Sequence, residues 1–456
     1  MADATGTSTS ARRRLTRWSA IASLLLATAA LAACGDSGTG SSTGSAGSAT
    51  SANTGATADT GGVTGKQVTD VLKIDSANAG KGKTFELGAA LALSGPGSFY
   101  GKVMKEGIDL ATAQIKAAGG PDIHVTYKDH KSGNAQAGSR LTRELGIAKT
   151  PAVLASYVGD IGSMFPGVAQ YKMLALDGGG GTSDFGQGKP YFWGMRAIEP
   201  DDDFVGALKY WKATEPAVKK ISLVYIDQGP INKIVEANFK KAVAAAGLQF
   251  ASAETTAIGS TDYSSTIAKL KTANPDAVFT FLIGVDAGYF MKQFVNAGLK
   301  QPVIGSEYVP DAAKIAGAAF DGYQFSTDWF RADAPVNPWS KLFVDSYRKR
   351  YGKDPNYYAA NFYEDTFAIW DLIRRVLAKG GDINSGEALQ AELVAKPQFQ
   401  SVYGGSASEV GTVTLDTTKH TVTSRPLSVL SHNGGNPKTL ATYELGGADF
   451  KLAEGG

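Results

Sequence analysis

The 456-residue sequence predicts an α/β protein made of two doubly wound parallel-sheet lobes of similar size. Apolar runs of strand length alternate with segments of helical spacing from Thr84 onward, and a second set of the same kind begins near Asp201. Strands that alternate with helices form a parallel sheet covered by helices on both faces. Roughly 370 residues follow the N-terminal low-complexity segment, and this length implies about two domains.

The first set of elements contains four predicted strands and two predicted helices. Phe85 to Leu93 is an apolar run typical of a buried strand, and Val103, Ile108 and Ile115 recur at helical spacing. The strands cover residues 85–93, 123–127, 152–157 and 173–176, and the helices cover residues 101–118 and 135–147.

The second set repeats this alternation and ends in a different pattern. Asp262 stands at an N-cap position, and Asn274-Pro275 closes the helix that it opens. The predicted strands are 220–226, 277–283 and 302–304, and the predicted helices are 231–246, 262–274 and 288–296. Two aromatic-rich helices follow at 339–351 and 357–377, and residues 411–415 and 427–430 are predicted to form a closing hairpin.

The N-terminal segment 1–33 has the features of an export signal. Arg12, Arg13, Arg14 and Arg17 precede an uncharged run from Trp18 to Ala33, which is short for a spanning helix and suits a signal-peptide core. Small residues before Cys34 match a bacterial lipobox, which predicts a lipid on Cys34 and a mature N-terminus at that residue. The alternative is an ordinary signal peptide with a chance cysteine, and both general and twin-arginine export stay open.

Residues 34–65 are predicted to form a flexible tether, because Gly, Ser, Thr and Ala dominate them and large apolar residues are nearly absent. Segment 1–33 holds four of the 45 basic and one of the 43 acidic residues, so 41 basic and 42 acidic residues remain after it. No basic run survives that would neutralise phosphates. The charge balance therefore argues against a nucleic-acid partner.

Residues that carry catalysis are scarce in this sequence. The four histidines have no metal-ligand spacing, and Cys34 is the only cysteine. The phosphate-loop pattern ending in Lys-Ser/Thr is absent. We therefore predict that the protein is not an enzyme and that it uses no metal and no cofactor.

Glycine and polar residues cluster where four of the predicted strands end. Ligands of open α/β sheets bind at the carboxyl ends of the strands. Glycine turns and helix starts present unpaired N–H groups that receive a carboxylate, and a carboxylate such as Glu307 suits an ammonium. Together these groups predict a zwitterion site, with ordinary turn chemistry as the alternative for each loop. The segments are 94–97, 156–163, 177–182 and 305–308.

Several short motifs occur in a characteristic order between residues 84 and 435. They are Leu91 to Pro96 with Tyr100-Gly101, Ala118-Gly-Gly, Asp129 before an Asn/Ala/Gln helix, Thr261 to Ser264, Ala297 to Leu299 before Pro302, and Tyr363 to Thr366. In this order and spacing the chain resembles the branched-chain amino-acid (Leu/Ile/Val)-binding proteins, which are type I periplasmic binding proteins of ABC transporters.

The resemblance implies an extracytoplasmic solute-binding protein, held at the cell membrane through lipidated Cys34, that delivers a small amino acid or amino-acid-like ligand to ABC permease subunits. It also implies three hinge strands, near residues 197–199, 325–328 and 405–415. Lobe 1 would comprise residues 84–199 and 327–405, and lobe 2 would comprise residues 200–326 and 406–450. A ligand-sensing receptor of the same fold is the alternative function.

By position, the resemblance also assigns ligand contacts. Glu307 matches the carboxylate that receives the ligand ammonium, Tyr100 matches an aromatic of the pocket, and the loops at 159–162 and 179–182 match those that hold the α-carboxylate. The predicted ligand-binding residues are Tyr100, Gly159, Asp160, Gly180, Gly181, Thr182, Glu307 and Tyr308.

Four positions depart from the family pattern. Pro230 and Ile283 stand where the family has pocket tyrosines, and Asp160 and Asp177 stand where hydroxyl residues are usual. An ionised acid at that end of the pocket repels an α-carboxylate. A polar amino acid, an amide, a polyamine-like cation or an aromatic compound therefore stays open as the ligand.

Overall fold

The computed structural model describes residues 59–75, 77, 79–132, 135–156, 161–181, 185–434 and 437–454. All of them belong to one compact unit, residues 57–456. The predicted signal segment, Cys34 and most of the predicted tether lie outside the described residues. So do Gly159, Asp160 and Thr182 of the predicted site. In the part of the chain that is described, no helix combines the length and apolarity needed to cross a membrane.

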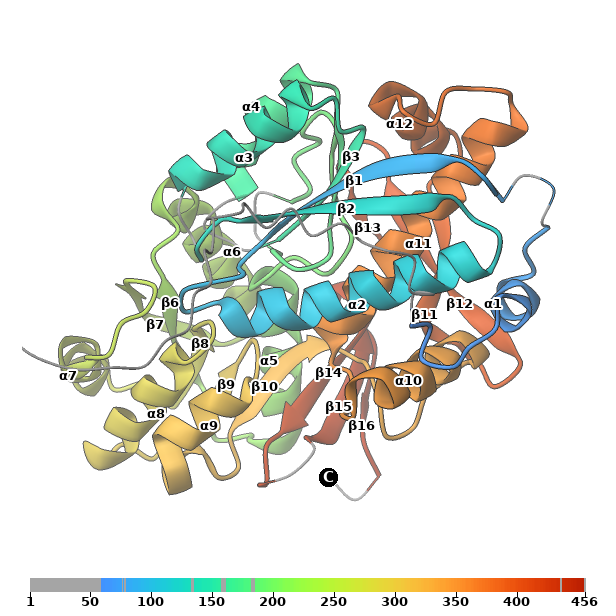
Figure 1. Cartoon of the computed structure of the whole chain (residues 1–456). Helices are drawn as coiled ribbons and strands as arrows, with labels where there is room; N and C mark the ends of the chain where they lie inside the picture. Colours follow the sequence, from blue (N-terminus) through green and yellow to red (C-terminus); the bar gives the residue numbers. More distant parts are fainter. Residues whose placement is uncertain are drawn as a thin grey trace, which may run out of the picture. The chain divides into compact units, whose positions relative to one another are not determined.

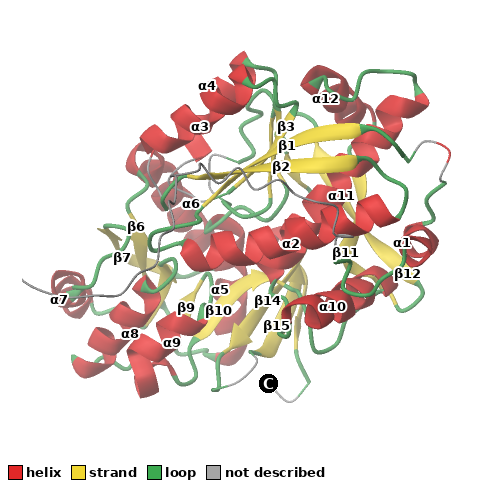
Figure 2. Ribbon diagram, in the orientation of Figure 1, coloured by secondary structure: helices red, strands yellow, loops and turns green. Residues whose placement is uncertain are grey.

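The first of two sheets has eight strands, in the order β11-β12-β13-β5-β4-β3-β1-β2 (Figures 1 and 2). Strand β1 runs parallel to both of its neighbours, with Leu87 opposite Val125 on one side and Ala152 on the other. The strands are β1 (Thr84–Leu91), β2 (Asp122–Asp129), β3 (Ala152–Ala155), β4 (Leu174–Asp177), β5 (Phe192–Gly194), β11 (Gln398–Ser406), β12 (Glu409–Asp416) and β13 (Thr421–Val422).

Helices cover both faces of this sheet. Leu87 and Leu91 of β1 belong to the core shared with α2 and α11, whereas Ala90 packs in a second cluster with Leu141 of α3 and Met164 of α4. Figure 1 shows α3 and α4 on one side of β1–β3 and α2 on the other. The helices of this lobe are α1 (Gly65–Leu72), α2 (Ser98–Ala117), α3 (Ala135–Ile147), α4 (Ile161–Gln170), α10 (Pro338–Tyr351), α11 (Tyr357–Ala378) and α12 (Gly386–Ala395).

The second sheet repeats the plan in the order β16-β15-β14-β10-β9-β8-β6-β7. Phe204 of α5 packs edge to face against Phe239 of α6 and Phe279 of β8. The strands are β6 (Lys220–Ile226), β7 (Gln249–Thr256), β8 (Ala277–Phe281), β9 (Val303–Gly305), β10 (Gln324–Asp328), β14 (Pro426–Ser431), β15 (Lys438–Glu444) and β16 (Ala448–Leu452). The helices are α5 (Asp201–Thr214), α6 (Asn232–Ala245), α7 (Ser264–Ala273), α8 (Asp286–Asn296) and α9 (Pro310–Ala316). The predicted two-lobed α/β fold is confirmed.

The predicted hairpin between 411–415 and 427–430 is wrong. Strand β12 pairs with β11 and, through β13, reaches β5 of the first sheet, whereas β14 pairs with β10 of the second sheet. The assignment of residues 409–422 to lobe 2 fails for the same reason. An apolar strand pattern predicts a strand but not its partner. It therefore could not show that the two strands join different sheets.

Three chain segments connect the two sheets: residues 195–200, 329–337 and 423–425. The first contains the predicted hinge at 197–199, and the second directly follows the predicted hinge at 325–328. The third differs from the prediction of 405–415, because those residues form part of the β11-β12 hairpin. We refer to these three segments as the crossing segments.

The predicted tether is shorter than residues 34–65. Gln114 of α2 donates to the carbonyl oxygen of Thr60 at 3.1 Å, and α1 begins at Gly65 behind a Thr64 capping box. A Cβ on Gly61 would lie 2.1 Å from the carbonyl oxygen of Ser346 in α10. The small residues that suggested flexibility therefore allow residues 59–65 to pack closely against the first lobe.

Candidate ligand site

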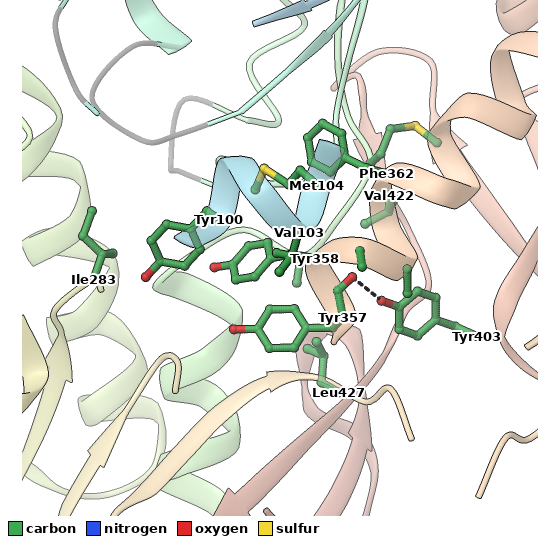
Figure 3. Close-up of a cluster of buried hydrophobic side chains, with 14 of the residues drawn as sticks. Tyr100, Val103, Met104, Ile283, Tyr357, Tyr358, Phe362, Tyr403, Val422 and Leu427 are labelled. Carbon is green, nitrogen blue, oxygen red and sulfur yellow. Dashed lines mark hydrogen bonds between the residues drawn. The ribbon is translucent and has the colours of Figure 1, made fainter. Parts of the chain in front are cut away.

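The candidate site lies where strand ends of the two sheets meet. Its cavity has a volume of about 10 Å³. The lining residues come from both lobes: Tyr100, Met104, Gly179, Glu199, Ile283, Glu307 and Tyr358. Figure 3 shows the hydroxyl ends of Tyr100, Tyr357 and Tyr358 directed to the same side, toward Ile283. Tyr100 begins its helix and Glu307 follows β9, so the βα connections place these side chains as predicted for an open α/β sheet.

Glu307 is the centre of the polar contacts in this cavity. Its side chain is buried, and its Oε2 accepts a hydrogen bond from the Tyr358 hydroxyl at 2.9 Å. Its Oε1 accepts from the Tyr100 hydroxyl and from the backbone N–H of Gly284, the latter at 2.5 Å. Gly284 adopts a φ of 61°, which points this N–H at the carboxylate and favours glycine. Burial raises the pKa of Glu307.

A second carboxylate, that of Glu199, reaches the cavity from the first crossing segment. It forms an ion pair with Arg196, and both side chains are buried. The Arg196 guanidinium lies 5.2 Å from the ring centroid of Tyr358 and 5.6 Å from that of Tyr357. Burial raises the pKa of Glu199 to about 8, although Arg196 opposes this shift.

Backbone N–H groups of the glycine run after β4 are hydrogen-bonded to a side chain of the same protein. The N–H groups of Gly179 and Gly180 both donate to Oδ1 of Asp177, at 2.9 and 2.6 Å. Burial raises the pKa of Asp177 to about 7, against the effect of these two hydrogen bonds. Gly181 lies beside Glu199, since a Cβ on it would be 3.2 Å from Cγ of Glu199.

The crossing segments are joined by a buried charge network. Arg196 and Arg425 bind opposite oxygens of Asp328, with Nε distances of 3.2 and 3.1 Å, and Arg425 also pairs with Glu364 at 3.1 Å. The Arg425 guanidinium stacks 3.8 Å from the ring centroid of Tyr403. Burial alone would raise the pKa of Asp328, but the two arginines hold it below its usual value. The network therefore links all three crossing segments: Arg196 lies in the first, Asp328 directly precedes the second, and Arg425 lies in the third.

The structure brings some of the predicted site residues together and separates others. Tyr100 and Glu307 are in direct contact, and Gly180 and Gly181 lie beside the cavity. Tyr308 does not line it; its ring stacks on His432 with centroids 4.7 Å apart. Lys314, the lysine of the helix that follows Glu307, pairs with Asp311 at 2.8 Å and not with Glu307.

Sequence reasoning missed the contributions of Glu199, Arg196 and Tyr358. Asn356 caps α11, and Tyr357 and Tyr358 are the first two residues of this helix. This pair of tyrosines at a helix start was the sequence signal that could have identified Tyr358. Within the described ranges, no group of three or more His, Cys, Asp or Glu side chains is arranged to hold a metal ion. The described cavity is small, and its walls are acidic and aromatic.

Comparison with known proteins agrees with this geometry. The Leu/Ile/Val-binding protein homolog 6 of Brucella abortus is 24% identical over 333 residues, which cover 69% of this chain and 82% of the relative. The branched-chain amino acid transporter substrate-binding protein LivJ from Streptococcus pneumoniae, solved with isoleucine, is 20% identical with a TM-score of 0.67. The match covers 80% of this chain and 99% of that chain.

Another solved structure with the same fold has a different ligand. The solute-binding protein of an ABC transporter from Rhodopseudomonas palustris HaA2, in complex with p-hydroxybenzoic acid, is 20% identical with a TM-score of 0.66. The match covers 80% of this chain and 98% of that chain. The relatives are transport binding proteins and not enzymes. A model of the family described as periplasmic binding protein matches residues 84–436. As the sequence motifs predicted, the chain belongs to the periplasmic binding protein family, whose place is extracytoplasmic.

Proposed function

We propose that this protein captures a small amine-bearing solute, an amino acid or an amino-acid-like molecule, between its two lobes and delivers it to the permease subunits of an ABC importer. The observation that carries the proposal is Glu307. Its buried carboxylate receives three neutral hydrogen-bond donors, and no ion pair among the described residues includes it. A cation that also donates hydrogen bonds stabilises such a carboxylate most, and an ammonium is such a cation.

Capture requires the two lobes to separate. The cavity of about 10 Å³ has room for one water molecule at most, and not for an amino acid. Tyr100 belongs to the first lobe and Glu307 to the second, so their contact closes the cleft. A solute reaches Glu307 after this contact breaks, and closure around the solute restores the burial of the site.

The electrostatics of the cleft favour an amine over an aromatic carboxylate. Relatives named for Leu, Ile and Val binding support an amine-bearing ligand, whereas the p-hydroxybenzoic acid complex represents the competing class. Glu199 and Glu307 both line the cavity. Burial raises the pKa of both groups, and a ligand whose only charge is a carboxylate would raise it further, whereas an ammonium stabilises their ionised forms.

Ligand-induced stabilisation of the full chain tests the proposal. We expect amino acids or primary amines to raise its unfolding temperature, because a ligand present at 100 times its Kd stabilises the folded state by about 2.7 kcal/mol. A panel that also contains p-hydroxybenzoic acid provides the matched comparison. Stabilisation by the aromatic carboxylate alone would contradict the proposal. Reduced uptake of the identified ligand in cells that lack the protein supports import, and unchanged uptake supports the sensing alternative.

We further propose that Cys34 carries a lipid that holds the protein at the membrane. Cys34→Ser is expected to remove the acceptor sulfur, so that the variant is released from membranes or accumulates unprocessed. Membrane fractionation followed by immunoblotting measures this, with Ser42→Ala in the same segment as the control. A Cys34→Ser variant that stays with the membrane fraction like the wild type would show that another feature anchors the chain.

A further inference from the structure

We infer that the cleft selects amines that lack a carboxylate group, because Asp177 of the chain itself occupies the backbone donors of the glycine run and the cavity wall is acidic. This inference rests on the proposed capture of an amine at Glu307. It narrows the ligand to primary amines such as the decarboxylated counterparts of amino acids.

The first step concerns the backbone donors beside the cavity. Gly179 lines the cavity, and its N–H group and that of Gly180 are successive backbone donors of the kind that can receive an anion. Both already donate to Oδ1 of Asp177, which is fixed at the end of β4. An internal carboxylate competes at a high effective concentration because its attachment to the chain removes the entropic cost of association. A ligand carboxylate therefore gains little from these donors.

The second step concerns charge. Of the described side chains that line the cavity, two carry carboxyl groups, Glu199 and Glu307, and none is a cation. Arg196 lies behind this wall, where it is shared between Glu199 and Asp328. In the described cluster, Glu199, Glu307, Asp328 and Glu364 face only two guanidinium groups, those of Arg196 and Arg425. Burial raises the pKa of both Glu199 and Glu307; an ammonium opposes this effect and favours their ionised forms, whereas a carboxylate on the same ligand would raise both pKa values further.

The third step concerns the remaining walls. The rings of Tyr100 and Tyr358 meet edge to face, with their centroids 5.0 Å apart. The ring centroids of Tyr357 and Tyr358 are 4.4 Å apart. Aromatic faces attract an ammonium, and Ile283 and Met104 supply apolar surface for a hydrocarbon tail. The cavity thus offers an acidic wall, tyrosine rings and an apolar wall, which together match a primary amine with an apolar or aromatic body.

Isothermal titration of the full chain with matched pairs tests the inference. The pairs are leucine and 3-methylbutylamine, tyrosine and tyramine, and lysine and cadaverine. We expect the amine of at least one pair to bind about tenfold tighter than its amino acid, or more. Amino acids that bind as tightly as their amines, or tighter, would overturn the inference and leave the proposed capture of an amine intact. Binding of p-hydroxybenzoic acid alone would overturn both.

Variants of Asp177 test the mechanism. Asp177→Ala frees the N–H groups of Gly179 and Gly180 and removes an acidic group, so the ratio of amine to amino-acid affinity is expected to fall about tenfold. Asp177→Asn keeps an acceptor oxygen for both N–H groups and is expected to retain most of the preference. The ratio compares two ligands on one folded variant, so a change in stability does not affect it. An unchanged ratio in Asp177→Ala would overturn the role assigned to Asp177.

Discussion

Replacing Glu307 with glutamine is expected to lower the affinity for an amine ligand by about 2–5 kcal/mol, the range measured when one partner of a buried charge pair is removed. The substitution keeps the size of the side chain and removes its charge. It also replaces one acceptor oxygen by an amide NH2 group, so the side chain can no longer accept either the hydrogen bond from Tyr358 to Oε2 or those from Tyr100 and Gly284 to Oε1. Calorimetric titration measures the loss.

Two controls separate the charge of Glu307 from its surroundings. Tyr358→Phe keeps the ring and the carboxylate but removes one hydroxyl donor, so a smaller loss of about 1 kcal/mol is expected. Lys314→Ala removes an exposed lysine that pairs with Asp311 and not with Glu307, so affinity is expected to stay at the wild-type value. Equal affinity of Glu307→Gln and wild type for an amine would remove Glu307 from the site.

Acidification should imitate the Glu307→Gln substitution. Binding of an ammonium requires the ionised carboxylate, and burial raises the pKa of Glu307 above its ordinary value of 4.5. The affinity of the wild type is therefore expected to fall as the pH decreases through this raised pKa, while the affinity of the variant changes less. Titrations at several pH values in the same buffer series provide the comparison.

Asp328→Asn is expected to lower the free energy of unfolding by about 3–5 kcal/mol, because the buried Arg196 and Arg425 each lose the carboxylate that they share and keep one further acidic partner, Glu199 or Glu364. Urea unfolding followed by tryptophan fluorescence measures the change. Asp311→Ala is the control, since it breaks the exposed pair with Lys314 and is expected to change stability little. Equal unfolding midpoints for Asp328→Asn and wild type would show that the network does not stabilise the crossing segments.

The pH dependence of this effect has a definite sign. The two arginines hold the pKa of Asp328 below its ordinary value of 3.8 although burial opposes them. The stabilisation by the ionised carboxylate is therefore fully present above pH 3.8 and is lost as the pH falls through the lowered pKa. The difference in stability between wild type and Asp328→Asn is expected to shrink over this acidic range.

The parallel core of the fold could be predicted from the sequence because its signals are local. The helix predicted at 135–147 and the strand predicted at 220–226 match α3 and β6 to the residue. Both have the periodicity that burial imposes on such elements. Strand β7, with half-buried residues along most of its length, and the three-residue β5 lack that signal and were not predicted.

The site could be predicted only in part, because its remaining contacts join distant segments. Glu307 follows a predicted strand, so the rule for strand ends identified it, and the family resemblance identified Tyr100. The pairing of Arg196 with Asp328, and the approach of Tyr358 to Glu307, depend on how the crossing segments and α11 pack. The hydrogen bonds of Asp177 to Gly179 and Gly180 are local, and an aspartate two residues before a glycine run was a signal for them.

Arg196 belongs to two structures at once, since one of its nitrogens binds Glu199 in the cavity wall and another binds Asp328 at the joint between the lobes. A cation that enters the cavity competes with Arg196 for the charge of Glu199, and Arg196 in turn shares Asp328 with Arg425. If the proposed capture of an amine is right, ligand binding and lobe movement are thermodynamically linked through Arg196, and each influences the other to the same extent. We then expect a substitution that changes the charge of the preferred ligand to change the stability of the joint as well.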